Sequence, residues 1–345
     1  MVAPPEPVPA AAGSSWRSAM LVALLAALGR PSTWAVALAG FLVRGGLVVV
    51  ALPIVVLPSV LGVAIVLAPA LAPFVLGETS PMFVALVGLV VGGLTAWVVV
   101  GGLIGAWADL ALVRAAAADE DFDVRLADRP GGLWRALAVR LIAHLPLAIA
   151  LAWGATRIVD AAYREVILPD ELTTPIVLRV LRDVPDAVTA VIGAWLFGEA
   201  VGGLAQRRLW SSEASIPAAL GWATARFVRR PVATIGTLVL TTVIVGVAVV
   251  IPALVAGVAW RRLHAALAAD GPPFEVAVAL GLFVCLWLAA LLFAGAVTAW
   301  RSFAWTAEAF RSDRASEAVP TGGTIGDRDV GRPGEWPTTD VSGSL

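Results

Sequence analysis

The sequence predicts an all-α membrane protein, a polytopic transmembrane helical bundle of about six spans. Hydrophobic residues make up 59% of the 345 residues and charged residues only 14%, whereas soluble domains have about 45–50% and about 25%. The mean hydropathy is +0.89, and several apolar stretches exceed the roughly 18 residues that mark a membrane helix. Such a chain has more apolar surface than a soluble protein exposes to water, so the additional apolar surface is expected to face lipid.

Two polar tails flank the apolar part of the chain. Residues 1–15 and 312–345 are rich in Pro, Gly, Ser, Thr and charge, so they bury too little apolar surface to offset the entropy lost on ordering. We predict disordered tails there and a transmembrane domain over residues 16–311. The segment 16–30 has one Arg before an apolar stretch, as a signal peptide has, but the next apolar run follows at once with no polar segment between.

The first long apolar run covers residues 32–77 and is too long for one span. As a single helix it would measure about 68 Å, against a hydrocarbon core of about 30 Å. We predict a membrane helix at 33–56 and a proline-broken interfacial or re-entrant piece at 57–78; a second span there would give seven in all. The remaining predicted spans are 82–113, 141–163, 185–206, 232–258 and 275–300.

The placement of arginines predicts the orientation. All 24 basic residues are Arg, and with six spans 17 of them fall on the side of the termini, six on the other side, and Arg44 within the membrane. Because basic loops stay in the cytoplasm, both termini are predicted to be cytoplasmic. The sequence has no Lys and no Asn, whose codons are A/T-rich, which indicates a high-GC bacterial genome. We therefore expect a multi-pass protein of the bacterial cytoplasmic membrane. The outward loop 157–186 mixes both charges, as solvated helix extensions do.

Three stretches of the chain share one pattern: a Trp, then basic residues on a short helix, then a Pro, then an apolar hairpin. They begin at Trp16, Trp134 and Trp222. The pattern predicts three tandem units, each an interfacial helix plus a helical hairpin. The spacing between the anchor prolines is uneven, at 115 and then 85 residues, so chance similarity is the alternative.

The Arg-Pro pairs at 30–31 and 230–231 and the small residues of the second helices resemble a known membrane domain. This is the six-helix domain fused to some bacterial glycerophosphodiester phosphodiesterases and found in related stand-alone membrane proteins. The resemblance covers residues 16–311. It implies a bundle of hairpins that anchors or organises. It implies no catalytic residue, because the phosphodiesterase domain of the fused relatives has no counterpart in this sequence.

The short basic helices predict contact with anionic lipid. In the third unit Leu220, Thr224 and Val228 share one helical face and the arginines lie opposite, so one face can enter the headgroup layer while the other meets phosphates. The residues predicted to face anionic lipid are Arg135, Arg140, Trp222, Arg226, Arg229 and Arg230. An ordinary positive-inside loop that only sets the topology is the alternative.

Three charged residues fall inside the predicted spans: Arg44, Asp109 and Glu199. Each would cost about 2.5–3.5 kcal/mol at the membrane centre, so intramembrane charges are candidates for function. Counted from the nearest flanking Arg, Arg44 lies about 21 Å along its helix and Glu199 about 12 Å, while Asp109 is shallow enough to hydrate. We predict an Arg44–Glu199 ion pair that joins the first two hairpins. A transport site that uses the same residues is the alternative.

Small residues at helical spacing predict close helix packing. Glycine pairs four residues apart occur at 88/92, 101/105 and 198/202, and such pairs allow helix backbones to approach. Gly45 and Gly46, next to Arg44, predict a loosened helix at the point where the charge must find a partner.

No motif in the sequence predicts catalysis or metal binding. The carboxylate run 119–123 lacks the pattern of an EF-hand loop, so a solvated loop is favoured. The only histidines, His144 and His264, fall near opposite membrane faces and cannot share a metal. Cys285 has no second cysteine to pair with. We expect no metal, no cofactor and no enzymatic activity, and the net charge of −1 gives no basic field for nucleic acid.

These observations predict a non-enzymatic integral membrane protein. The favoured role is a scaffold or membrane-organising component whose basic interfacial helices hold anionic lipid, with the bilayer as its partner. The alternative is a small transporter or permease subunit in which Arg44 and Glu199 face a polar cavity. A dry, packed interface around these charges would favour the scaffold, and a cavity open to one side would favour the transporter.

Overall fold

The structure, a computed structural model, describes most of the predicted transmembrane domain. The described residues are 16–51, 79–119, 132–167, 176–269 and 271–317, with the single positions 54, 73, 77 and 126. Every regular element in these residues is a helix, which confirms the all-α class. Six helical stretches are long and apolar enough to cross a membrane: Ser32–Ala51, Pro81–Ala117, Leu145–Glu165, Pro185–Ser211, Pro231–Ala268 and Pro273–Phe310.

Five of the six predicted spans are confirmed as helices, with differences at their ends, and the first, at 33–56, is confirmed as a helix as far as Ala51. In the third unit, helix α12 (Pro231–Ala268) and helix α13 (Pro273–Glu317) are longer than predicted. Helix α13 stays helical through residues 312–317, where the sequence predicted the start of the tail. Residues 1–15, 318–345, nearly all of the 57–78 piece and most of the 119–123 carboxylate run lie outside the described residues.

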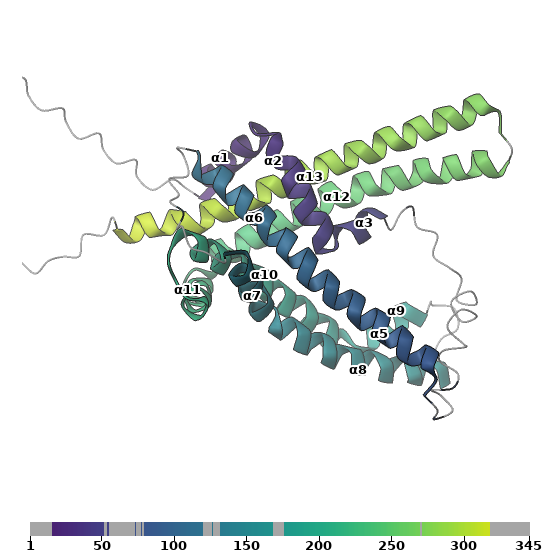
Figure 1. Cartoon of the computed structure of the whole chain (residues 1–345), viewed down its shortest axis with the longest axis horizontal. Coiled ribbons are helices and arrows are strands. Elements are labelled where there is room, and N and C mark those ends of the chain that lie inside the picture. The colour runs from purple at the N-terminus through teal and green to yellow at the C-terminus, as the bar shows by residue number, and fades with distance from the viewer. Residues whose placement is uncertain are drawn as a thin grey trace, which may run out of the picture.

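The helices follow one another in the predicted order, a short helix and then a pair of long helices, three times over (Figure 1). The first unit contains α1 (Trp16–Leu28), α2 (Ser32–Phe41), η1 (Leu42–Gly46), α3 (Leu47–Ala51), α5 (Pro81–Ala96), η2 (Trp97–Gly101) and α6 (Gly102–Ala117). The second contains α7 (Gly132–Ala143), α8 (Leu145–Ile167), α9 (Ile176–Asp183) and α10 (Pro185–Ser211). The third contains α11 (Ile216–Arg229), α12 and α13.

Proline and serine explain where several of these helices begin. Helices α5, α10, α11 and α12 have a proline in their first turn, where no helical hydrogen bond is lost because the first N–H groups have no partner within the helix. Ser80 caps α5 by accepting a hydrogen bond from the Phe83 N–H at 3.1 Å. Ser215 caps α11 in the same way, from Ala218 N–H.

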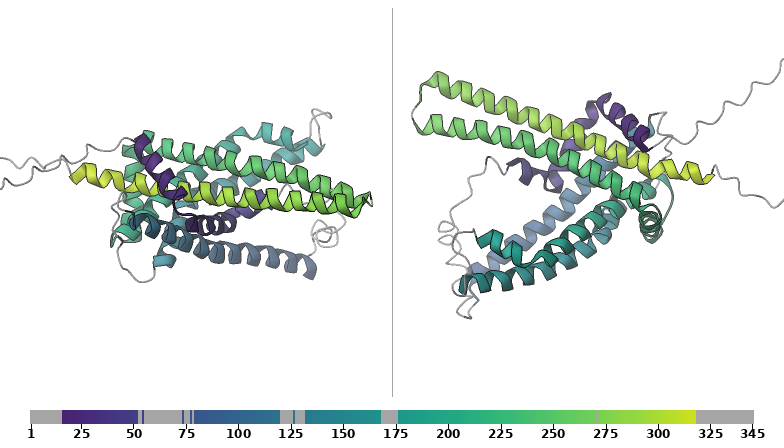
Figure 2. Two further views of the ribbon diagram at one scale, coloured as in Figure 1. Left: turned by 90° about the horizontal axis from the view of Figure 1, so that it is seen from above. Right: turned by 180° about the vertical axis from the view of Figure 1, so that it is seen from behind.

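The long helices converge at one end of the molecule and diverge at the other. The short helices α1, α7 and α11 lie at the converging end, which we call the short-helix end (Figure 1). From there the α12–α13 hairpin and the α8–α10 hairpin spread apart toward the tip end, where α12 turns into α13 (Figures 1 and 2). Large apolar side chains such as Leu89, Leu254 and Val278 are exposed there, as lipid-facing positions require.

The buried core lies mainly toward the short-helix end. One cluster packs α6, α7, α10 and α11 around Val113, Val139 and Leu204. A second packs α1 and α2 against α13 around Ala23 and Phe303. All three units contribute to this core, so the short-helix end holds the hairpins together.

The outward loop predicted at 157–186 consists partly of helix extensions. Helix α8 continues to Ile167, and the short helix α9 packs against it. Arg179 Nε lies 3.1 Å from Glu165 Oε2, so the balanced charges noted in the sequence pair between these two helices.

Helices α2 and α13 approach each other closely at Gly295. A Cβ at this position would lie 2.6 Å from the Trp34 carbonyl oxygen and 3.3 Å from Leu38 Cβ. We expect Gly295→Ala to destabilise the protein by about 1–3 kcal/mol because the helices must move apart. Thermal unfolding in detergent measures this. Gly281→Ala is the matched control, since a Cβ there meets no atom within 4 Å. Equal unfolding temperatures for the two variants would contradict the close approach.

Candidate functional site

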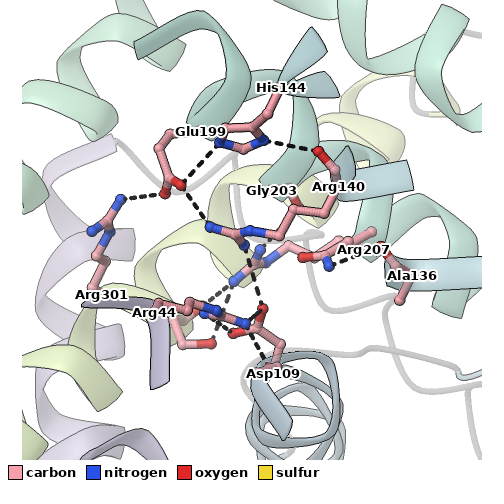
Figure 3. Close-up of polar contacts among 12 residues, drawn as sticks. Arg44, Asp109, Ala136, Arg140, His144, Glu199, Gly203, Arg207 and Arg301 are labelled. Atoms are coloured by element: carbon pink, nitrogen blue, oxygen red, sulfur yellow. Dashed lines mark hydrogen bonds and ion pairs between the residues drawn. The ribbon is translucent and has the colours of Figure 1, made fainter. Parts of the chain in front are cut away.

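Six charged side chains from all three units meet where the long helices converge (Figure 3). We call them the charge cluster. They come from η1, α6, α7, α10 and α13. The cluster consists of Arg44, Asp109, Arg140, Glu199, Arg207 and Arg301. It thus contains four guanidinium groups and two carboxylates.

Arg44 reaches the cluster because the first membrane helix is interrupted at that residue. Arg44 and Gly45 have non-helical dihedral angles, and Gly45 has φ 103°, in the left-handed region that glycine adopts readily. Arg44 Nη1 donates to Asp109 Oδ1 at 3.0 Å, and Nη2 donates to Asp109 Oδ2 and to the Gly105 carbonyl oxygen. A Cβ at Gly105 would lie 2.7 Å from Arg44 Nε. The loosened helix predicted at Gly45 and Gly46 is therefore present.

Arg140 connects the two carboxylates. Its Nη2 donates to Glu199 Oε1 at 2.6 Å, and its Nη1 lies 3.8 Å from Asp109 Oδ2. Burial lowers the pKa of Arg140, but its attraction to Glu199 and Asp109 outweighs this, so the pKa lies above its ordinary value. Arg140 on α7 thereby holds a carboxylate of the first unit beside a carboxylate of the second.

Glu199 is the most heavily contacted carboxylate of the cluster. Besides Arg140, it accepts a hydrogen bond from Arg301 Nη2 at 3.0 Å. His144 Nε2 lies 3.4 Å from Glu199 Oε1, and the other ring nitrogen lies 2.9 Å from the Arg140 carbonyl oxygen (Figure 3). The His144 ring fits against α10 only because residue 198 is a glycine, where a Cβ would lie 2.9 Å from the ring.

Arg207 differs from the other three arginines of the cluster. It is almost fully buried, and its partners are neutral: Nε donates to Thr306 Oγ1 at 3.2 Å, Nη1 to the Gly203 carbonyl oxygen at 2.9 Å, and Nη2 to the Ser302 carbonyl oxygen at 3.0 Å. Among the described residues no carboxylate lies within ion-pair distance of Arg207. Its hydrogen bonds are satisfied, but no neighbouring carboxylate forms an ion pair that compensates its charge.

A cavity of about 330 Å³ lies against the charge cluster, and all six cluster residues line it. The Ser302 and Thr298 side chains and several apolar residues also line it. With every guanidinium and both carboxylates charged, the cluster has a formal charge of +2. A cavity of this size holds a small ligand, and its charge favours an anion.

The three intramembrane charges predicted from the sequence do come together, but the predicted ion pair is wrong in its partner. Arg44 pairs with Asp109 rather than Glu199, because the kink at Gly45 and the space left by Gly105 direct its side chain toward α6. Glu199 is instead held by Arg140 and Arg301. The prediction that Asp109 is shallow enough to hydrate is also wrong, since only 7% of the residue is exposed.

Two basic residues predicted to face anionic lipid point inward instead. Arg140 belongs to the cluster, and Arg226 is buried and hydrogen-bonded to Glu308. Arg135 Nη2 donates to the Ala214 carbonyl oxygen at 2.6 Å. The predictions for Arg140 and Arg226 are therefore wrong. Arg135 is half-buried and its acceptor lies between α10 and α11, so its contact with lipid stays a prediction.

The other predicted lipid-facing residues remain at or near the surface. Trp222 is half-buried, with Arg208 5.3 Å and Arg226 5.4 Å from the centroid of its ring, which is cation–π distance. Arg229 and Arg230, at the end of α11, are exposed. Contact of these two arginines with anionic lipid stays a prediction.

Sequence reasoning missed Arg207, Arg301 and His144 as members of the site. One signal was present on α10, where Glu199 and Arg207 lie eight residues apart and therefore on the same face. Arg301 and His144 gave no such signal, because each lies near a predicted helix end, where a charged residue is ordinary.

Comparisons of this chain with protein-family models, with curated proteins and with solved structures found no match.

Proposed function

We propose that this multi-pass membrane protein binds a phosphate-type anion in the cavity at the charge cluster, as a non-enzymatic transporter or permease component. The observation that carries the proposal is the excess of two positive charges around a cavity between membrane helices. Charges that are unpaired inside a membrane protein commonly mark substrate or ion pathways. An anion in the cavity would offset the excess charge.

The arginines of the cluster differ in how much surface they offer to such an anion. The side chains of Arg44, Arg140 and Arg301 are 27%, 21% and 23% exposed, whereas Arg207 is buried among neutral acceptors. Guanidinium groups bind phosphate and carboxylate oxygens through two parallel hydrogen bonds. We therefore assign ligand contact to Arg44, Arg140 and Arg301, and a supporting role to Arg207.

Binding rather than catalysis is proposed because both carboxylates of the cluster are already engaged. Asp109 accepts hydrogen bonds from Arg44, and Glu199 accepts them from Arg140 and Arg301. A carboxylate held by guanidinium groups is a weak general base, since the ion pair stabilises its charged form.

A membrane-organising role is the second candidate function. It rests on the exposed Arg229 and Arg230 at the end of the amphipathic helix α11, which would contact lipid phosphates at the cytoplasmic face of a bacterial inner membrane. The resemblance to the domain linked to glycerophosphodiester phosphodiesterases stays a prediction and implies a similar role.

Glycerol 3-phosphate is expected to raise the unfolding temperature of the purified protein in detergent at constant ionic strength, and uncharged glycerol is not. Arg301→Gln is expected to weaken the apparent affinity about tenfold to a hundredfold, because losing a hydrogen bond to a charged group costs about 1.5–3 kcal/mol. Arg262→Gln, exposed at the tip end, is the matched control and should bind like wild type. The proposed function fails if no phosphate-specific shift is seen, or if the two variants respond alike.

A further inference from the structure

The residues that line the cavity at the charge cluster are buried toward one end of the molecule and more exposed toward the other. Toward the short-helix end its lining includes Ala37, Leu112 and Trp305, which are 1%, 3% and 4% exposed. Toward the tip end its described lining includes Val49 and Trp195, which are 39% and 36% exposed. The exposed rim is therefore apolar and faces the spreading part of the bundle.

The direction of this opening follows from the course of the helices. Helix α10 begins at the tip end, so Trp195 lies one turn closer to that end than Glu199. Helix α3 leaves the cluster in the same direction, because Val50, next to Val49, packs against Val249 of α12 and Ala294 of α13. Moving from the tip end into the cavity, a molecule meets an apolar rim first and guanidinium groups second.

Two residues of the charge cluster lie far along their spans from the tip end. Asp109 and Arg301 each follow the proline that begins their span, Pro81 and Pro273, by 28 residues. A helix of that length measures about 42 Å, and a tilt of about 40° still leaves about 32 Å along the membrane normal. Because the hydrocarbon core is about 30 Å thick, Asp109 and Arg301 lie in the part of their spans nearest the short-helix end.

We infer that the anion bound at the charge cluster is the phosphate headgroup of a membrane phospholipid, which enters from the bilayer with its acyl chains passing between Val49 and Trp195. This inference rests on the proposed function and names its ligand class. A free phosphate ester shares the headgroup chemistry but has no acyl chains to contact the apolar rim of Val49 and Trp195.

The test compares three probes on the purified full-length chain at one detergent concentration: dihexanoyl phosphatidic acid, glycerol 3-phosphate and dihexanoylglycerol. The lipid with the phosphate is expected to bind more than tenfold more tightly than glycerol 3-phosphate, since each buried methylene increases affinity about fourfold. Uncharged dihexanoylglycerol measures nonspecific partition and is expected to bind wild type and Arg301→Gln equally.

Variants of the rim separate the two parts of the ligand. Val49→Ser and Trp195→Ala are expected to remove most of the preference for the lipid while leaving glycerol 3-phosphate affinity within about twofold of wild type. Both side chains are exposed, so their loss leaves the packed core intact. Arg301→Gln is expected to weaken the binding of both phosphate-bearing probes. Arg262→Gln is expected to leave the binding of both unchanged.

The outcomes distinguish this inference from the proposed function. Equal affinity for phosphatidic acid and glycerol 3-phosphate, or rim variants that keep the lipid preference, would overturn the inference and leave the anion site standing. Binding of neither phosphate-bearing probe would overturn both. Native mass spectrometry of protein extracted from membranes provides a second measurement that does not need the rim variants. Wild type is expected to retain a bound phospholipid that Arg301→Gln loses. Equal retention of phospholipid by the two proteins would count against the inference.

Discussion

Replacing Asp109 by Asn is expected to destabilise the protein by about 3–5 kcal/mol. Asp109 is the carboxylate that accepts hydrogen bonds from Arg44 through both of its oxygens, and Arg140 lies close to it. Removing one partner of a buried ion pair leaves the other charge uncompensated, which costs more than the pair itself contributes. The substitution would also raise the formal charge of the cluster from +2 to +3.

A double-mutant cycle with Arg44→Gln tests this explanation. The variant with both substitutions is expected to be more stable than Asp109→Asn alone, because the unpaired guanidinium is gone. Unfolding temperatures in detergent are the measurement. Asp160→Asn, an exposed position on α8, is the matched control and should change stability by no more than about 0.5 kcal/mol. Additive effects of the two substitutions would show that Arg44 and Asp109 are not coupled.

The fold could be predicted to the level of spans because apolar run length and proline positions are local signals. The helices at Pro81, Pro185 and Pro231 begin where the sequence has a proline after polar residues, and a proline in the first turn costs no hydrogen bond. The length of α13 was underestimated because its charges after Arg301 suggested an exit from the membrane. They continue instead on the same helix toward Glu317.

Three of the six members of the charge cluster could be predicted from the sequence, but their pairing could not. Depth along a helix, counted at 1.5 Å per residue, identified Arg44, Asp109 and Glu199, but it assumes a straight helix. The kink at Gly45 rotates Arg44 toward α6. A count of residues along a helix gives the depth of a side chain but not the direction in which it points around the helix axis. Arg140 was assigned to lipid because it is one of the basic residues on a short helix that precedes a hairpin, yet this helix packs against α10.

Glu199→Gln is expected to have opposite effects on stability and on anion binding. The carboxylate accepts from Arg140 Nη2 through Oε1 at 2.6 Å and from Arg301 Nη2 through Oε2 at 3.0 Å. A glutamine has an NH₂ group in place of one of these oxygens, so one of the two guanidinium groups faces a donor instead of an acceptor. Stability is therefore expected to fall by about 3–5 kcal/mol. The loss of a negative charge beside the cavity is expected to increase the affinity for glycerol 3-phosphate about tenfold, most strongly at low ionic strength.

The sign of that affinity change separates an anion site from its alternatives. Affinity is expected to rise from Arg301→Gln through wild type to Glu199→Gln, following formal cluster charges of +1, +2 and +3. The double variant Glu199→Gln/Arg301→Gln restores +2 and is expected to bind near the wild-type level. Glu275→Gln at the exposed tip of α13 changes the net charge of the protein equally but lies far from the cluster, so it should not alter affinity. If affinity instead fell in Glu199→Gln, or rose as much in Glu275→Gln, the arginines of the cluster would serve to hold the three units together rather than to bind an anion.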